Sequence, residues 1–263
     1  MDNIIEQLKD DAQYYDGIGK QYVSNSDIST LLYNPKQFKQ PIKDNLNLVK
    51  GRVFHHLMLI DDAPDVDLID ASTRSTKVYK ETLLESGKDF LMLQKEYDET
   101  LRLTKVMQSN LFVSDIIYSS ECKYEEPGIT RIHDVDWKGK ADIITSEPFS
   151  ITMETDDEPR TFAYNDGAII DLKTTSSIDK FSKSISAFNY DSQAYIYRQL
   201  FGKEMVFIVI DKEDDRIGIF PCEESVYERG ERKVLKACKQ WHKYYGPNKY
   251  EDPEDFILTQ SLY

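Results

Sequence analysis

Apolar residues recur at two different spacings along the chain, and the change of spacing divides it into three parts. Within the first part, residues 24–112, a short capped helix and an apolar run come first, and apolar side chains then return every three or four positions over 81–112, which is typical of an amphipathic helix. Between 116 and 173, short runs rich in β-branched and aromatic residues follow one another between turn-forming residues, which indicates strands. Helical spacing then returns, interrupted by one further pair of strands. Helices, then a meandering sheet, then helices predict a single α+β or three-layer α/β domain.

The spacing of apolar residues also gives approximate bounds for the individual helices and strands. A short helix is capped by residues 24–27 and ended by Pro35, and segment 49–60 is apolar enough to be a buried helix or a strand end. The other predicted helices lie within 81–112, 182–201 and 225–245, and the predicted strands are 116–124, 129–135, 139–145, 151–154, 161–164, 168–173, 205–211 and 217–222. We expect an N-terminal extension over 1–23 and one domain over 24–263. Within it, a helical part (24–112) precedes a core of sheet and helices (113–245).

Composition narrows the class of protein. Forty per cent of the 263 residues are hydrophobic, so we expect a folded globular chain, and no run approaches the ~20 apolar residues that a membrane span needs. The N-terminus is acidic rather than signal-like, and three scattered cysteines form no CxxC pair. We therefore expect a cytoplasmic protein that lacks zinc and iron–sulfur sites.

The net charge of −14 argues against non-specific binding to nucleic acid. The charge is uneven, however, because lysines and arginines recur between residues 36 and 80 and again between 173 and 183. The sequence is thus compatible with a local basic groove on an acidic body. The acidic insert 146–167 is longer than a tight hairpin needs, and it fits a decorated hairpin, a subunit contact or a partner surface.

Two apolar runs end in residues that suggest chemistry. Asp171 and Lys173 are two positions apart in a predicted strand, so both side chains point to the same face. Asp142 lies on another predicted strand upstream. Carboxylates of this kind can hold a divalent metal, and the lysine can orient or deprotonate a water, or offset charge, beside it. This combination is the minimal equipment for metal-assisted hydrolysis of a phosphodiester.

The order of these features resembles the PD-(D/E)XK nucleases, and more narrowly their exonuclease VIII-like (RecE-like) and RecB-like branch. The resemblance runs from about residue 24 to 197, and it implies a restriction-endonuclease-like core with a central mixed sheet flanked by helices. It rests on six anchors in the right order: Ser24-x-Ser26 with Leu32, Pro35 and Phe38; Gly51-Arg52-Val53-Phe54-His55; Arg74-Ser75-Thr76-Lys77; Glu121; Asp142 with Asp171-x-Lys173; and Gln193-Ala194-Tyr195-Ile196-Tyr197. The chain departs from the family pattern at Ala141, where a proline would stand.

The resemblance implies a role for each anchor. Asp142, Asp171 and the backbone carbonyl of Leu172 would bind Mg²⁺, with His55 as an additional ligand that also suits Mn²⁺. Lys173 would act on the attacking water, and Glu121, Gln193 and Tyr197 would lie near the metal, the lysine or the DNA backbone. The residues expected to bind DNA are Arg52, Arg74, Lys77 and Lys80. Plainer interpretations remain open: His55 as a core histidine, Glu121 as an exposed strand residue, and the 74–80 segment as a solvated run of charge.

The implied activity is a Mg²⁺- or Mn²⁺-dependent deoxyribonuclease that digests duplex DNA from its ends, 5′→3′ and without ATP. No GxxxxGK[ST] motif occurs in the chain. The resemblance further implies a homo-oligomeric ring, a single-strand annealing protein or recombinase as partner, and a phage or DNA-recombination setting. Two alternatives stay open: a structure-specific endonuclease or Cas4-like end trimmer without an iron–sulfur cluster, and a catalytically silent nuclease fold that binds or regulates.

Overall fold

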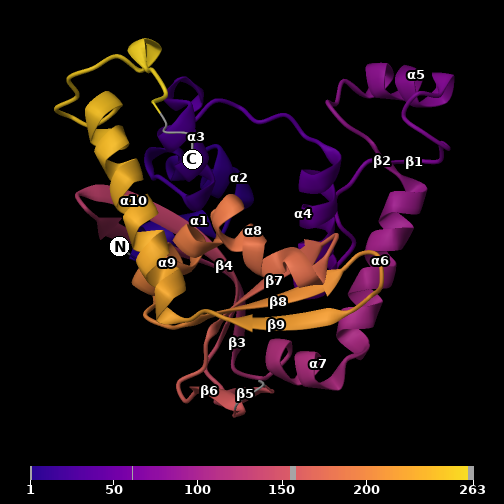
Figure 1. Cartoon of the computed structure of the whole chain (residues 1–263). Helices are drawn as coiled ribbons and strands as arrows, with labels where there is room; N and C mark the ends of the chain where they lie inside the picture. Colours follow the sequence, from indigo (N-terminus) through magenta and orange to yellow (C-terminus); the bar gives the residue numbers. More distant parts are fainter. Residues whose placement is uncertain (1, 61, 155–157, 260–263) are drawn as a thin grey trace.

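The computed structural model describes residues 2–60, 62–154 and 158–259. Its centre is a five-stranded mixed sheet in the order β3-β4-β7-β8-β9 (Figure 1). The strands are β3 (Cys122–Ile132), β4 (Val135–Thr145), β7 (Ile169–Thr175), β8 (Met205–Asp211) and β9 (Ile217–Pro221). β7 and β8 are parallel, and the other neighbours in this sheet are antiparallel. The predicted mixed α/β fold with helices around a central sheet is confirmed.

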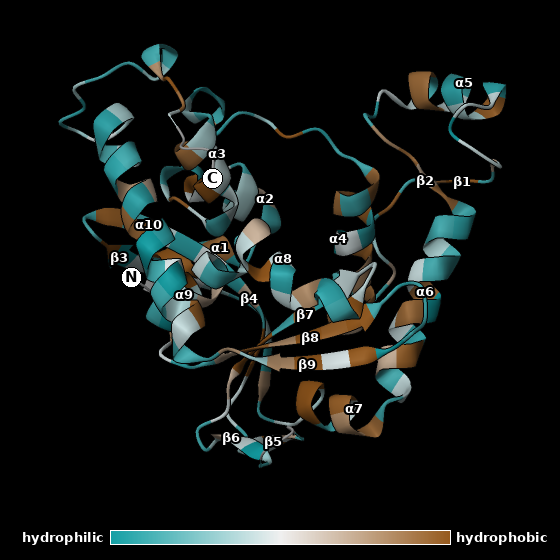
Figure 2. Cartoon of the chain, in the orientation of Figure 1, coloured by the Kyte–Doolittle hydropathy of each residue, from teal (hydrophilic) through white to brown (hydrophobic). Residues whose placement is uncertain are grey.

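Strand β8 shows why the sheet is covered on both faces. All seven of its residues are buried, and successive side chains enter different cores. Met205, Phe207 and Val209 pack on one side, while Val206, Ile208 and Ile210 pack on the other. A strand whose first six residues are all apolar has to be sandwiched between two layers, and Figure 2 shows the brown of these residues along β8.

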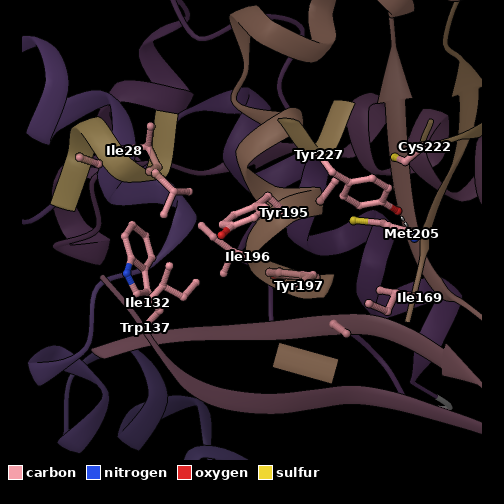
Figure 3. Packing of buried hydrophobic residues seen from close by; sticks show 14 of the residues in the cluster. Ile28, Ile132, Trp137, Ile169, Tyr195, Ile196, Tyr197, Met205, Cys222 and Tyr227 are labelled. Carbon is pink, nitrogen blue, oxygen red and sulfur yellow. Dashed lines mark hydrogen bonds between the residues drawn. The ribbon is translucent and has the colours of Figure 1, made fainter. Parts of the chain in front are cut away.

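The first core lies under α3 (Ile28–Tyr33), α9 (Tyr190–Phe201) and α10 (Glu224–Tyr244). Trp137 of β4 and Tyr195 of α9 are among its largest side chains, and Tyr227 of α10 accepts a hydrogen bond from the backbone N–H of Met205 (2.7 Å) (Figure 3). Gly230 allows α10 to approach α9 closely, because a Cβ there would lie 2.1 Å from the carbonyl oxygen of Asp191.

The second core lies under α4 (Leu46–Leu59), α6 (Gln94–Ser109) and α7 (Leu111–Ile117). α4 begins at Asn45, whose side chain accepts hydrogen bonds from two backbone N–H groups of the first turn. It contributes Phe54 and Met58 to this core. Segment 49–60, for which a helix or a strand end was open, is therefore mostly helix.

The remaining elements surround this sandwich. α1 (Asp2–Leu8) and α2 (Asp11–Tyr15) precede the sheet, and the short parallel pair β1 (Leu68–Ile69) and β2 (Met92–Leu93) flanks α5 (Lys77–Ser86). The insert 146–167 forms an antiparallel pair, β5 (Phe149–Met153) and β6 (Arg160–Tyr164), with its residues 155–157 outside the described part. α8 (Phe181–Ala187) precedes α9, and no helix of the described residues is long and apolar enough to cross a membrane.

Four predicted elements differ from the structure. The strand predicted over 129–135 is wrong as one strand, because it spans the end of β3, the turn at His133 and Asp134, and the first residue of β4. The strand predicted over 116–124 is wrong in its first half, because Ile116 and Ile117 end helix α7, which begins at the cap Asn110. The helix predicted within 81–112 is split by β2 into α5 and α6. The helix predicted over 182–201 breaks at Asn189, whose φ of 59° is left-handed.

Candidate functional site

A matched distortion of β3 and β4 creates the site. Along β4, Ala141 packs in the first core and Ile143 in the second, so the alternation of side chains is reset at Asp142. On β3, Glu125 has a φ of 50°, and it lies between the paired positions Tyr124↔Ile143 and Glu126↔Ala141. A non-glycine residue in the left-handed region is strained. The distortion places the Glu125 and Asp142 carboxylates beside each other at the point where the two strands change face.

His55 joins these two carboxylates from the second layer. It projects from α4, and its Nδ1 lies 3.2 Å from Oδ1 of Asp142. One ligand atom from each of His55, Glu125 and Asp142 lies within 4.8 Å of the others. One imidazole and two carboxylates at such separations are a donor set that a divalent cation such as Mg²⁺ or Mn²⁺ accepts. The residues therefore fit a metal ion.

Asp171 and Lys173 of β7 form the adjoining half of the site. Asp171 is 1% exposed, its Oδ2 is paired with the Lys173 ammonium, and its Oδ1 accepts a hydrogen bond from the side-chain amide of Gln193 (2.5 Å). The two halves are joined by the backbone N–H of Leu172, which donates to Oδ2 of Asp142 (2.8 Å). Because β4 and β7 are antiparallel neighbours, residues 30 positions apart in sequence meet here.

Charge and burial set the protonation of the Asp171–Lys173 pair. Burial raises the pKa of Asp171 to about 6; the Lys173 ammonium opposes this and the Asp142 carboxylate adds to it. Burial alone would lower the pKa of Lys173, yet the Asp171 and Asp142 carboxylates outweigh it and leave that pKa raised. Lys173 is therefore an ammonium at neutral pH.

The metal-ligand cluster has its own pattern of pKa values. Burial would raise the pKa of Asp142, but the His55 imidazole, the Lys173 ammonium and the Leu172 N–H hold it below its usual value. Burial would lower the pKa of His55, and the Asp142 carboxylate reverses this so that the pKa is raised. Burial, assisted by Asp142, raises the pKa of Glu125 to about 7. Without an added cation, this cluster therefore holds carboxylates that repel each other.

The cluster opens into a cleft of about 1040 Å³. Its walls come from α2, α4, the segment after α4, the segment between α5 and β2, and the β3–β4 pair. His55, Glu125 and Asp142 all line it, and Tyr15 of α2 lines it as well. A ligand that enters this cleft can reach the metal-ligand cluster directly.

The structure gathers most of the expected catalytic and metal residues and separates others from them. Asp142, Asp171, Lys173, His55, Leu172 and Gln193 are connected as described. Tyr197 lies one turn further along α9, and its hydroxyl donates to the backbone carbonyl of Lys140 (2.9 Å). Asp171 is held by Gln193 and Lys173 and is not in the group of three that surrounds the candidate metal position.

Glu121 requires a correction. It is exposed in the turn before β3, whereas Glu125, four residues later, is in the cluster. The expected strand ended at residue 124, but β3 runs from Cys122 to Ile132, so the carboxylate that faces Asp142 comes later in the chain. A signal was present in the adjacent acids Glu125 and Glu126, but their register depends on a backbone distortion that no local pattern reveals.

The residues expected to bind DNA are dispersed. Arg52 lines the cleft and makes two hydrogen bonds to Asp44, each 2.8 Å. Arg74 makes two hydrogen bonds to Glu96 (2.7 and 2.5 Å) and stacks over Phe90, so its guanidinium is already engaged. Lys77 and Lys80 are exposed on α5 and do not line the cleft.

Comparison with known proteins supports the fold. No family model and no curated protein matches the sequence. Among solved structures, the chain is similar to a candidate exonuclease from Eubacterium rectale, with 13% identity, a TM-score of 0.56 and coverage of 95% of this chain and 94% of the other. It also matches a phage-related exonuclease from Haemophilus somnus, with 13% identity, a TM-score of 0.30 and coverage of 77% and 94%. The first likeness shows a shared fold, and that fold is one found in a protein named for exonuclease activity.

Proposed function

We propose that this protein is a metal-dependent nuclease, and more narrowly an exonuclease that hydrolyses duplex DNA from its ends. The observation that carries the proposal is the convergence of His55, Glu125 and Asp142 on one cleft, where Asp142 is joined through the Leu172 N–H to the strand that carries the Asp171–Lys173 pair. These residues come from four separate elements, and their chemistry is that of phosphodiester hydrolysis. The shared fold with a candidate exonuclease supports the same conclusion.

His55, Glu125 and Asp142 would hold the metal, which when bound polarises the phosphate and activates water. Lys173 carries a positive charge at neutral pH because two carboxylates face it. It is therefore suited to orient the attacking water and to stabilise the negative charge that develops on the phosphate. The same raised pKa makes it a poor general base. Asp171 holds Lys173 in place, and Gln193 holds Asp171 from the neighbouring helix.

The finer attributes of the proposal rest on the resemblance of the motifs to the RecE-like branch of the PD-(D/E)XK nucleases. They comprise Mg²⁺ with Mn²⁺ as a substitute, 5′→3′ polarity without ATP, a ring-shaped homo-oligomer, an annealing protein or recombinase as partner, and phage or recombination biology. We also keep the proposed organisation into an N-terminal extension over 1–23 and one nuclease domain over 24–263.

The test is digestion of end-labelled linear duplex beside closed circular DNA, with Mg²⁺, Mn²⁺ or EDTA. We compare the wild type with Lys173→Met, which removes the charge and keeps an unbranched side chain one atom shorter, and with Lys123→Met on the exposed edge of β3 as a matched control. Loss of linear DNA alone, dependent on metal and abolished only by Lys173→Met, supports the exonuclease, and the label reports polarity. Cutting of the closed circular DNA would favour the endonuclease alternative over the exonuclease. Absence of hydrolysis under every metal refutes both.

A further inference from the structure

Every lysine and arginine that lines the cleft is paired with an aspartate that lines it too. Arg52 of α4 is bonded to Asp44, Lys88 after α5 to Asp67, and Lys140 of β4 to Asp11 of α2. The three cations lie on three different walls around the metal-ligand cluster. A cleft that binds a polyanion needs cations, yet here each cation already has an anionic ligand.

In all three pairs the aspartate is exposed to solvent, with 39% of the Asp44, 49% of the Asp67 and 76% of the Asp11 side chain accessible. Arg52 presents its planar fork to Asp44 in the two-bond geometry that a phosphate also accepts. Lys88 and Asp67 are 2.9 Å apart with both side chains about half exposed. Lys140 is itself enclosed, with its ammonium 4.7 Å from the centre of the Tyr14 ring, whereas its partner Asp11 is 76% exposed.

The Arg52–Asp44 and Lys88–Asp67 pairs are solvent-exposed on both sides. Such pairs contribute little net stability, so exchanging one anionic partner for another costs little. A phosphate presents the same kind of oxygen acceptors as a carboxylate. It can therefore replace the aspartate as the partner of the cation, while the aspartate side chain rotates towards the solvent. The cations thus remain ordered in the free protein, with side chains directed by their aspartates.

We propose that Arg52, Lys88 and Lys140 are phosphate-binding positions of the cleft, and that Asp44, Asp67 and Asp11 occupy them until the DNA backbone displaces these carboxylates. This inference rests on the proposed function for the identity of the polyanion. Lys88 and Lys140 are additional to the expected DNA-binding residues. The aspartates compete with the DNA phosphates for the three cations, so they lower the affinity of the cleft for DNA.

The exchange makes an unusual prediction: removing an acid improves binding. A carboxylate and a phosphate roughly 6 Å apart in water repel each other enough to change an equilibrium about threefold. We therefore expect Asp44→Asn, Asp67→Asn and Asp11→Asn each to bind DNA about threefold more tightly. We expect Arg52→Gln to bind more weakly, because it removes the cation instead of its competitor.

The test is fluorescence anisotropy of a fluorescein-labelled linear duplex in EDTA, which prevents metal-dependent hydrolysis. The matched control is Asp179→Asn, which also removes one charge from an exposed two-bond pair, with Arg216, outside the cleft. Tighter binding by the cleft variants than by this control is the expected result. Binding by all three cleft variants that equals the control, or is weaker, overturns the inference. Thermal unfolding confirms that each variant folds.

The two proposals fail separately. Tighter binding by the cleft variants, without hydrolysis of DNA by the wild type under any metal, would retain the phosphate positions and refute the nuclease. If the wild type hydrolyses DNA but the cleft variants bind DNA no more tightly than Asp179→Asn does, the nuclease proposal stands and the exchange of aspartate for phosphate is refuted.

Discussion

Glu125 offers the sharpest test of the site, because it is the ligand that the sequence did not reveal. We consider Glu125→Gln, which removes the charge and retains the size of the side chain. In the folded protein, burial and the adjacent Asp142 raise the pKa of Glu125 from 4.5 to about 7. Since one pKa unit corresponds to about 1.4 kcal/mol, ionised Glu125 lowers the free energy of unfolding by about 3 kcal/mol at a pH well above 7.

The direction of the pKa shift of Glu125 determines the pH range in which this residue affects stability. The folded protein binds this proton more tightly than the unfolded chain does, so the glutamate costs nothing below its unfolded pKa. The cost then grows as the pH rises from 4.5 towards 7 and is complete above it. Without metal, Glu125→Gln should therefore be up to about 3 kcal/mol more stable than the wild type at pH 8.5 and equally stable at pH 4.

The assay is urea-induced unfolding in EDTA at both pH values. With a slope of roughly 3 kcal/mol per molar urea, the midpoint at high pH should rise by up to about 1 M. Glu121→Gln is the matched control, because Glu121 is exposed at the start of the same strand and lies outside the cluster. A Gln variant that is less stable than the wild type at pH 8.5, or that shows the same difference at both pH values, refutes the reasoning.

Three further substitutions probe the neighbouring parts. His55→Ala should weaken Mn²⁺ binding by at least about tenfold in isothermal titration calorimetry, since it removes one of three ligands; unchanged affinity would remove His55 from the metal site. Gln193→Leu should destabilise the fold by about 1–3 kcal/mol in denaturant unfolding, because a buried oxygen of Asp171 loses its amide donor. Gly230→Ala should lower the free energy of unfolding by about 1–3 kcal/mol, because the new Cβ would lie 2.1 Å from the carbonyl oxygen of Asp191. A neutral effect would contradict the close approach of α9 and α10.

The sheet was predictable because its pattern is local. The apolar positions of 139–145, 168–173 and 205–211 alternate or run continuously, and each segment is a strand in the structure. The same pattern put Asp171 and Lys173 on one face, where they form an ion pair. The two-residue spacing was sufficient for that conclusion, because β7 has no distortion like that of β4 and its side chains alternate as in a regular strand.

What escaped prediction depends on contacts between distant segments. Ile116 and Ile117 fit a strand as well as a helix, and the cap at Asn110 decides for the helix. Glu125 reaches the cluster because its backbone is in the left-handed region, and the sequence around it contains no signal that predicts this conformation. The partners of Arg52 and Arg74 are equally hidden, since Asp44 and Glu96 are 8 and 22 residues away from them in the chain.

The most direct test of the central claim compares one substitution at two places on strand β4. Asp142→Asn removes a carboxylate from the metal-ligand cluster. Asp136→Asn removes one from another position of β4, where Asp136 forms an exposed pair with Arg131 of the neighbouring strand β3. We would measure the release of acid-soluble nucleotides from linear duplex DNA as a function of Mn²⁺ concentration for both variants and the wild type. We predict hydrolysis by the wild type and Asp136→Asn, and a loss of at least about a hundredfold in Asp142→Asn. Equal activity in all three proteins would contradict the assignment of this site.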